Sequence, residues 1–261
     1  TKPLLARSAC LIGRIHRSER MRLSRTFLSL LSSARRPLTA GFFFAARVEK
    51  MAGRLHRDPM LDRLTPVNKT LIIVNVGVFL LQLLLGPAFE WWFALWPLET
   101  GLFRPWQILT YGFLHGGWTH LFFNMFALFM FGSEIERLFG AKRYLTYYLA
   151  CVVGAALMHM IVMSQTNLPP AATVGASGAV FGLLLAFGMA YPKRMIMLIF
   201  PPIPMPAWLF VTLYGILELY LGITQTLSGI AHFAHIGGMA TGFVLIRYWR
   251  SQRRGIPRSP W

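Results

Sequence analysis

Long stretches without a charged residue alternate with short polar or basic segments along this chain. The stretches that lack Asp, Glu, Lys and Arg cover residues 70–89, 105–133, 144–192, 195–217 and 219–246. Each reaches the roughly 20 residues that a helix needs to cross the core of a bilayer. The longest has room for two helices, and a polar turn at 164–170, which ends in two prolines, divides it. We therefore predict membrane-spanning helices over about 70–86, 113–133, 144–163, 173–191, 204–223 and 230–247.

The composition agrees with this pattern. Hydrophobic residues make up 55% of the 261 positions and charged residues only 13%, whereas soluble domains carry about 25% charged residues. We therefore predict an all-α membrane protein, built as a bundle of six transmembrane helices in the lipid bilayer.

The distribution of positive charge predicts the orientation of this bundle. Nearly all of the 26 basic residues fall on one side: before the first span, in the turn 134–143, at Lys193 and Arg194, and from Arg247 onward. Positive charge is enriched on the cytoplasmic side of membrane proteins, so both termini are predicted to be cytoplasmic. The net charge of +17 thus reads mainly as a topology signal. We do not predict nucleic-acid binding, because the basic residues are scattered around spans without a recognisable binding module.

The N-terminal part differs in kind from the rest. Residues 1–50 hold eleven basic residues against Glu19 and Glu49, a composition that resembles an organelle transit peptide. A disordered extension, or a start of translation at Met51 or Met60, is the alternative. We expect three parts, namely a basic extension over 1–65, a membrane domain over 66–248 and a basic cytoplasmic tail over 249–261.

The scarcity of acidic residues excludes several kinds of active site. The only aspartates, Asp58 and Asp62, precede the first span. An intramembrane aspartyl dyad and a buried Asp in a Ser-His-Asp triad are therefore both excluded. A His-Glu-x-x-His motif is absent, and Cys10 and Cys151 offer neither a disulfide framework nor a metal cluster, so no metal or other cofactor is expected. Ser, His and Asn remain as the polar groups available for chemistry.

Four of these polar residues are predicted to lie at a common depth. His120 and Asn124 come early in the second span, Ser177 early in the fourth, and His235 early in the sixth, and all three spans run inward. At 1.5 Å per residue, these side chains lie roughly 5 to 15 Å below the outer surface. Polar residues in a span usually face the protein interior or a water-filled cavity. We therefore expect one wet pocket that opens to the outside.

Glycine spacing indicates which helices meet in this pocket. Gly178 and Gly182 follow Ser177, and Gly238 and Gly242 follow His235, each pair four residues apart. Small residues at this spacing let membrane helices approach closely. Such packing would bring the Ser177 hydroxyl within reach of the His235 imidazole, as in a nucleophile with its general base.

The same chemistry requires donors for the negatively charged oxygen of a tetrahedral intermediate. His120 and Asn124 are four residues apart and share one helix face, so both can converge on that oxygen. The backbone N–H of Ser177, near the start of its helix, is a third candidate donor.

Each of these signals also has an ordinary structural explanation. Gly, Ala and Ser commonly line packed membrane helices, and a single intramembrane His can be a packing residue. We interpret Glu134 and Glu136 as structural. Glu218, near the outer end of the fifth span, is expected to contact an interface or a neighbouring helix rather than to take part in chemistry.

Taken together, the residues resemble the rhomboid family of intramembrane serine proteases. The resemblance covers about 66–247 and is carried by His120-Leu-Phe-Phe-Asn124, Gly132-Ser-Glu-Ile-Glu-Arg-Leu-Phe-Gly140, Gly175-Ala-Ser-Gly178 and Ala234-His-Ile-Gly-Gly238 with Gly242. It implies a six-helix fold, Ser177 as nucleophile, His235 as base, and His120 with Asn124 in the oxyanion site. It also implies single-span membrane proteins as substrates, cleaved near the outer face, and no cofactor. We choose His235 over His232 as the base on this resemblance and on the glycine spacing.

Two positions depart from the pattern of the family. Gln107 stands where the family often has Arg, which questions the anchoring of the first loop. Phe181 stands where Tyr is common, and its ring is expected to pack against His235.

Two rival functions remain open from the sequence. The first is a catalytically inactive rhomboid-like protein that binds membrane helices. The second is a haem or metal carrier that uses outward-lying histidines, for which the candidates are His115, His120, His159, His232 and His235. We expect a bacterial plasma membrane, with the mitochondrial inner membrane as the alternative.

Overall fold

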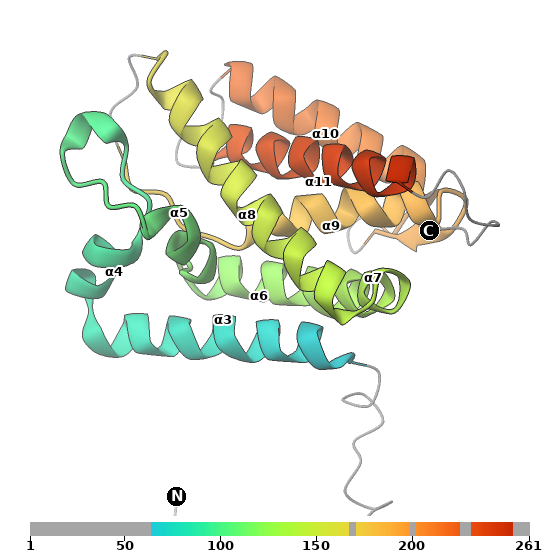
Figure 1. Ribbon diagram of the computed structural model, residues 1–261, viewed down its shortest axis with the longest axis horizontal. Helices are drawn as coiled ribbons and strands as arrows, with labels where there is room; N and C mark the ends of the chain where they lie inside the picture. The colour runs from blue at the N-terminus through green and yellow to red at the C-terminus, as the bar shows by residue number, and fades with distance from the viewer. Residues whose placement is uncertain (1–63, 167–170, 199–201, 225–230, 253–261) are drawn as a thin grey trace, which may run out of the picture. The chain divides into compact units, whose positions relative to one another are not determined.

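The computed structural model describes residues 64–166, 171–198, 202–224 and 231–252. Most of the predicted extension 1–65 and of the predicted tail 249–261 lies outside these ranges. The described part is mostly helical (Figure 1), as the hydrophobic pattern predicts.

Every predicted span overlaps a helix. The helices concerned are α3 (Pro66–Leu85), α6 (Trp118–Ala127) with α7 (Ser133–Phe139), α8 (Ala141–Met163), α9 (Ser177–Ala190), α10 (Ala207–Thr224) and α11 (His232–Gln252). Among the described residues, α3, α8 and α10 are long and apolar enough to cross a membrane. Large hydrophobic side chains on α3 and α10 are exposed, with Leu84 at 79% and Ile223 at 67%, as expected for surfaces in contact with lipid.

Several boundaries differ from the prediction. The fifth helix starts at Ala207 rather than near 204, because residues 204–206 form strand β2 (Pro204–Pro206), which pairs antiparallel with β1 (Met195–Met197). Two prolines in β2 lack the N–H that a helix requires. The fourth helix starts at Ser177 rather than near 173, because Thr173 forms a backbone bridge to Leu95 in the first loop, between the first and second spans. The expectation of a wholly α-helical chain therefore needs this small hairpin as a correction.

The second predicted span is not one regular helix. A π-helical turn at Leu128–Gly132 separates α6 from α7. The Leu128 carbonyl accepts a hydrogen bond of 2.9 Å from the Asn68 side chain of α3, and the Asn68 side-chain oxygen accepts one of 2.7 Å from the Tyr144 hydroxyl of α8. The widened turn thus supplies a carbonyl that ties α3 to the rest of the bundle.

Glu136 of α7 satisfies the N-terminus of α3. Its carboxylate accepts hydrogen bonds from the backbone N–H groups of Val67, at 3.2 Å, and Asn68, at 2.7 Å, and from the Thr65 hydroxyl. The first N–H groups of a helix have no partner within the helix, and a negative charge there also interacts favourably with the helix dipole. The structural role expected for Glu136 is confirmed.

The first loop is held together by Gln107, which is buried. Its side-chain oxygen accepts hydrogen bonds from the backbone N–H of Arg104, at 3.0 Å, and of Trp96, at 3.4 Å. Its amide nitrogen donates to the carbonyls of Trp92, at 3.3 Å, and Leu102, at 3.4 Å. A neutral amide therefore anchors this loop, and the doubt raised by the missing Arg is resolved.

Helix α11 packs most extensively against α8 and α9. Helix α10 runs beside α11 (Figure 1) and packs less extensively, against α11 and α9. The predicted close approach of α9 and α11 is confirmed at Gly178 and Gly238, where a side chain on Gly238 would overlap the Gly178 carbonyl. The Tyr147 hydroxyl of α8 donates a hydrogen bond of 2.7 Å to the Gly182 carbonyl and so joins the third helix to this pair.

Candidate active site

The contact between α9 and α11 aligns Ser177 with His235. Ser177 is the first residue of α9, and His235 lies in the first turn of α11. The Ser177 Oγ and the His235 Nε2 are 2.8 Å apart, a hydrogen-bond distance. His235 is buried, whereas Ser177 is partly exposed. The juxtaposition predicted from glycine spacing is present.

Gly175 lies between the His120 imidazole and the Ser177 hydroxyl. Its φ of +136° is a conformation that residues with a side chain rarely adopt. A Cβ on Gly175 would lie 2.8 Å from the His120 Nε2 and 3.5 Å from the Ser177 Oγ. The His120 imidazole and the Ser177 hydroxyl therefore border the same small space, which only glycine leaves open.

Hydrogen bonds fix the segment that directly precedes Ser177. The Gly175 N–H donates a hydrogen bond of 2.9 Å to the Tyr111 carbonyl, and the Tyr111 hydroxyl donates one of 2.8 Å to the Val152 carbonyl of α8. The Thr173 hydroxyl lies 2.8 Å from the His159 Nε2. These bonds hold Thr173 and Gly175 in place just before α9, which starts at Ser177.

Asn124 is buried on α6, one helical turn after His120. Its side-chain nitrogen donates a hydrogen bond of 3.0 Å to the His120 carbonyl. Within the described residues, Asn124 makes no hydrogen bond to Ser177 or His235. The amide carries a second N–H, which remains available for a substrate oxygen.

Phe181 stacks on the His235 ring, as expected. The two ring centroids are 4.2 Å apart and the planes are inclined by 7°. The opposite partner of Phe181 is Tyr214 of α10, at a centroid distance of 4.8 Å. The contact needs a ring and no hydroxyl, so Phe can make it at this position.

Glu218 is the functional candidate that sequence reasoning missed. This residue of α10 does reach a neighbouring helix, as expected, but the group it reaches is the imidazole of His235. Its Oε2 lies 2.7 Å from the His235 Nδ1, on the side of the ring opposite Ser177. A continuous chain of hydrogen bonds therefore joins a serine, a histidine and a carboxylate. The sequence indicates that Glu218 and His235 lie at a similar depth. It does not indicate which face of the fifth helix carries Glu218.

His232 shares the same carboxylate oxygen. Its Nδ1 also lies 2.7 Å from the Glu218 Oε2, and it makes no contact with Ser177. Among the described residues, these three form the only cluster of ligand side chains that could hold a metal. The two 2.7 Å separations from the Glu218 Oε2 are hydrogen-bond distances.

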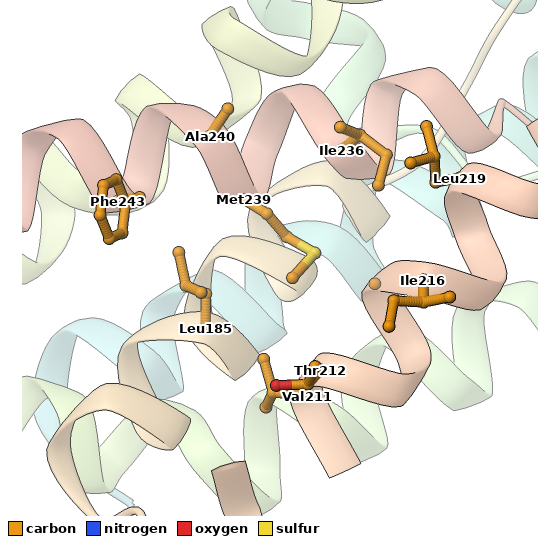
Figure 2. A pocket seen from close by; sticks show the side chains of 10 residues that line it. Leu185, Val211, Thr212, Ile216, Leu219, Ile236, Met239, Ala240 and Phe243 are labelled. Atoms are coloured by element: carbon orange, nitrogen blue, oxygen red, sulfur yellow. The ribbon is translucent and has the colours of Figure 1, made fainter. Parts of the chain in front are cut away.

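Two further histidines among the described residues make contacts of their own. His159 is bonded to Thr173, and His115 is buried with its ring 5.3 Å from that of His120. Figure 2 shows a groove of about 470 Å³ between α9, α10 and α11. Its walls are aliphatic and aromatic, and its ten lining residues include Leu219 and Met239 but no histidine. This groove therefore offers no imidazole to a haem.

Comparison with known proteins agrees with the geometry. Residues 103–252 match the family described as the rhomboid domain, which is more than half of the chain. The chain belongs to the rhomboid family, and it is an integral membrane protein.

Similar curated proteins come from a plant, a bacterium and a yeast. The chain is 37% identical to RHOMBOID-like protein 4 of Arabidopsis thaliana, over 59% of the chain and 39% of that protein. It is 31% identical to the mitochondrial RHOMBOID-like protein 12 of the same plant, over 71% and 58%, respectively. It is 32% identical to the rhomboid protease GluP of Bacillus subtilis, over 53% and 25%. The chain thus spans only part of the length of each of these relatives.

Proposed function

We propose that this protein is an intramembrane serine endopeptidase that cleaves single-span membrane proteins near the outer face of the bilayer. The observation that carries this proposal is the hydrogen bond of 2.8 Å between the Ser177 Oγ and the His235 Nε2, at a partly exposed serine. Membership of a family that includes a protein named as a protease supports the same reading.

The reaction follows from the positions of these two groups. The Ser177 Oγ attacks the carbonyl carbon of the scissile peptide bond, and its proton passes to the His235 Nε2. The C–N bond then breaks, and the leaving amine takes that proton. Water next attacks the ester carbon and gives a proton to His235, after which the C–O bond to Ser177 breaks and the proton returns to the serine oxygen.

The negative oxygen of each tetrahedral intermediate requires donors that water cannot supply here. His120 borders the space next to Ser177, and Asn124 follows it by one turn on α6. The start of α9 adds backbone N–H groups without a helical partner. We assign these groups to the oxyanion site.

The short fourth helix supports a reaction centre below the surface of the membrane. Helix α9 has 14 residues and is therefore about 21 Å long, whereas the hydrocarbon core is about 30 Å thick. Residues 171–176 lie outside the helix at its N-terminal end, and Ser177 follows them directly. Water that enters from that side would reach the hydroxyl without crossing the bilayer.

We further propose that six helices cross the membrane and that both termini are cytoplasmic. Basic residues that support this orientation gather at one end of the bundle, where Arg194 pairs with Glu134 at 3.4 Å and Arg143 lies over the Trp249 ring. The tryptophan-rich first loop lies at the opposite ends of α3 and α6, where aromatic residues suit the membrane interface.

We propose the plasma membrane of a bacterium as the location, with the mitochondrial inner membrane as the alternative. The likeness to a protein of Bacillus subtilis supports the first, and the likeness to a plant relative named as mitochondrial supports the second. Fractionation of the source cells distinguishes the two.

The test is cleavage of a panel of single-span substrates in liposomes by the wild-type protein and by Ser177→Ala and His235→Ala. We expect both variants to lose at least about 10³-fold in kcat while they keep the thermal unfolding profile of the wild type. Undiminished cleavage by either folded variant contradicts the proposal. Wild-type protein that binds the substrates without cleaving them indicates the inactive, helix-binding alternative instead.

A further inference from the structure

We propose that Glu218 is a positioning residue for the general base, so that catalysis by this protein depends on a buried glutamate of α10. This inference rests on the proposed function, because it assigns a role toward the Ser177–His235 pair. The residue itself does not touch the reacting atoms.

The geometry supports this role through the tautomer of His235. An ionised carboxylate only accepts hydrogen bonds, so the Nδ1 that lies 2.7 Å from the Glu218 Oε2 must carry the proton. A neutral imidazole protonated on Nδ1 has its lone pair on Nε2, which is the atom that faces Ser177 at 2.8 Å. Glu218 thereby keeps the base in the one neutral form that can take the serine proton.

The burial of the carboxylate strengthens its effect in the charged state of the reaction. The side chains of Glu218 and His235 are only 6% and 10% exposed. When His235 takes the serine proton it becomes an imidazolium next to this carboxylate, and two opposite charges attract more strongly where water is excluded. The stabilisation arises only after proton transfer, so it should lower the barrier and leave substrate binding unchanged.

His232 explains how the carboxylate is kept in place. Its Nδ1 donates to the same Oε2 from one turn earlier on α11, also at 2.7 Å, and its Nε2 is buried without a hydrogen-bond partner among the described residues. A buried carboxylate is costly unless it is hydrogen-bonded. His232 supplies a second donor and fixes the side chain of Glu218 across the contact between α10 and α11.

The experiment compares Glu218→Gln and Glu218→Asp with wild type, and uses Leu217→Ala as a control. Leu217 is the preceding residue on α10 and its side chain is exposed. Each protein is measured for kcat and KM on a single-span substrate, for labelling of Ser177 by a fluorophosphonate probe, and for thermal unfolding. All reactions are run with and without EDTA.

We expect Glu218→Gln to lower kcat and the labelling rate by about 10²- to 10⁴-fold with KM changed less than about threefold. Glu218→Asp keeps the charge and should fall between this variant and wild type. Leu217→Ala should match wild type. EDTA should change none of these values.

Several results would overturn the proposal. Wild-type labelling and turnover in folded Glu218→Gln would remove Glu218 from the mechanism while Ser177 and His235 keep their roles. Unfolding of both Glu218 variants would indicate a purely structural role. Loss of wild-type activity in EDTA would mean that the cluster works through a metal. Wild-type protein that is not labelled at Ser177 and does not cleave would overturn the proposed function, and this inference with it.

Discussion

The backbones of Gly178 and Gly238 touch where α9 passes α11, and no side chain separates them. Ser177 immediately precedes the first of these glycines, and His235 is three residues before the second. The spacing between the two helices at this point therefore sets the distance between the hydroxyl and the imidazole. Close packing of glycines and the proposed chemistry are two aspects of one contact.

Replacement of Gly238 by Ala should separate these helices. The added methyl group would overlap the Gly178 carbonyl, which is backbone and cannot move independently of α9. Overpacking of this kind typically costs about 1 to 3 kcal/mol. We expect a lower midpoint of thermal unfolding and loss of substrate cleavage.

Gly77→Ala is the matched control for this substitution. Gly77 lies on α3 with no atom near the position of its missing Cβ, so Ala should fit there and slightly stabilise the helix. If Gly238→Ala resembled Gly77→Ala in both stability and cleavage, the tight contact would not be what aligns the site.

The ring of Phe181 should matter more than the hydroxyl that is common at this position. Phe181→Tyr retains the stack on His235 and is expected to keep activity near that of wild type. Phe181→Leu removes an aromatic contact worth about 0.5 to 1.5 kcal/mol, so turnover should fall by roughly three- to tenfold. Values of kcat for the two variants check this, and equal loss in both would show that orientation of His235 does not depend on the stack.

Asn124→Ala should slow turnover more than it weakens substrate association. The proposed contact strengthens as the substrate oxygen gains charge, so it contributes to the transition state more than to binding. One lost donor of this kind typically lowers kcat by about 10²- to 10³-fold. Unchanged kcat would remove Asn124 from the oxyanion site and leave only its hydrogen bond to the His120 carbonyl.

Two glutamates of α7 should differ sharply in their effect on stability. Glu136→Gln removes the charge that accepts two backbone N–H groups at the start of α3, and should cost about 1 to 3 kcal/mol. Glu134→Gln removes an ion pair with Arg194, in which the Arg194 side chain is 52% exposed and the Glu134 side chain 32% exposed. This loss should cost less than about 1 kcal/mol. Thermal unfolding in one detergent compares them, and equal midpoints would argue against the capping role.

The hydrophobic pattern predicts the positions of the helices but not their irregular ends. Uncharged runs report what lies in an apolar environment, and they do so equally for a helix, a strand or an extended segment. For this reason the pattern predicts neither the strand pair β1–β2 nor the non-helical residues directly before Ser177. The π-helical turn depends on Asn68, which is 60 residues away from Leu128. Such a partner is not visible from local sequence.

The sequence likewise predicts some residues of the candidate site but not others. Ser177 and His235 could be paired from the sequence because glycines mark the contact between their helices. Glu218 could not, because residues 225–230 separate α10 from α11 and leave the rotation of α10 undetermined from sequence. The sequence predicts a contact between Glu218 and an interface or a neighbouring helix. It does not predict that this contact is a hydrogen bond to the proposed base.

Helix α10 carries Glu218 and packs less extensively than α8, α9 or α11. Any outward tilt of α10 would pull the carboxylate from two imidazoles at once and leave His235 free to adopt either tautomer. An outward position of α10 and a hydrogen bond between Glu218 and His235 therefore exclude each other. Under the proposed function, a polypeptide that displaced α10 would be hydrolysed only after the helix had returned.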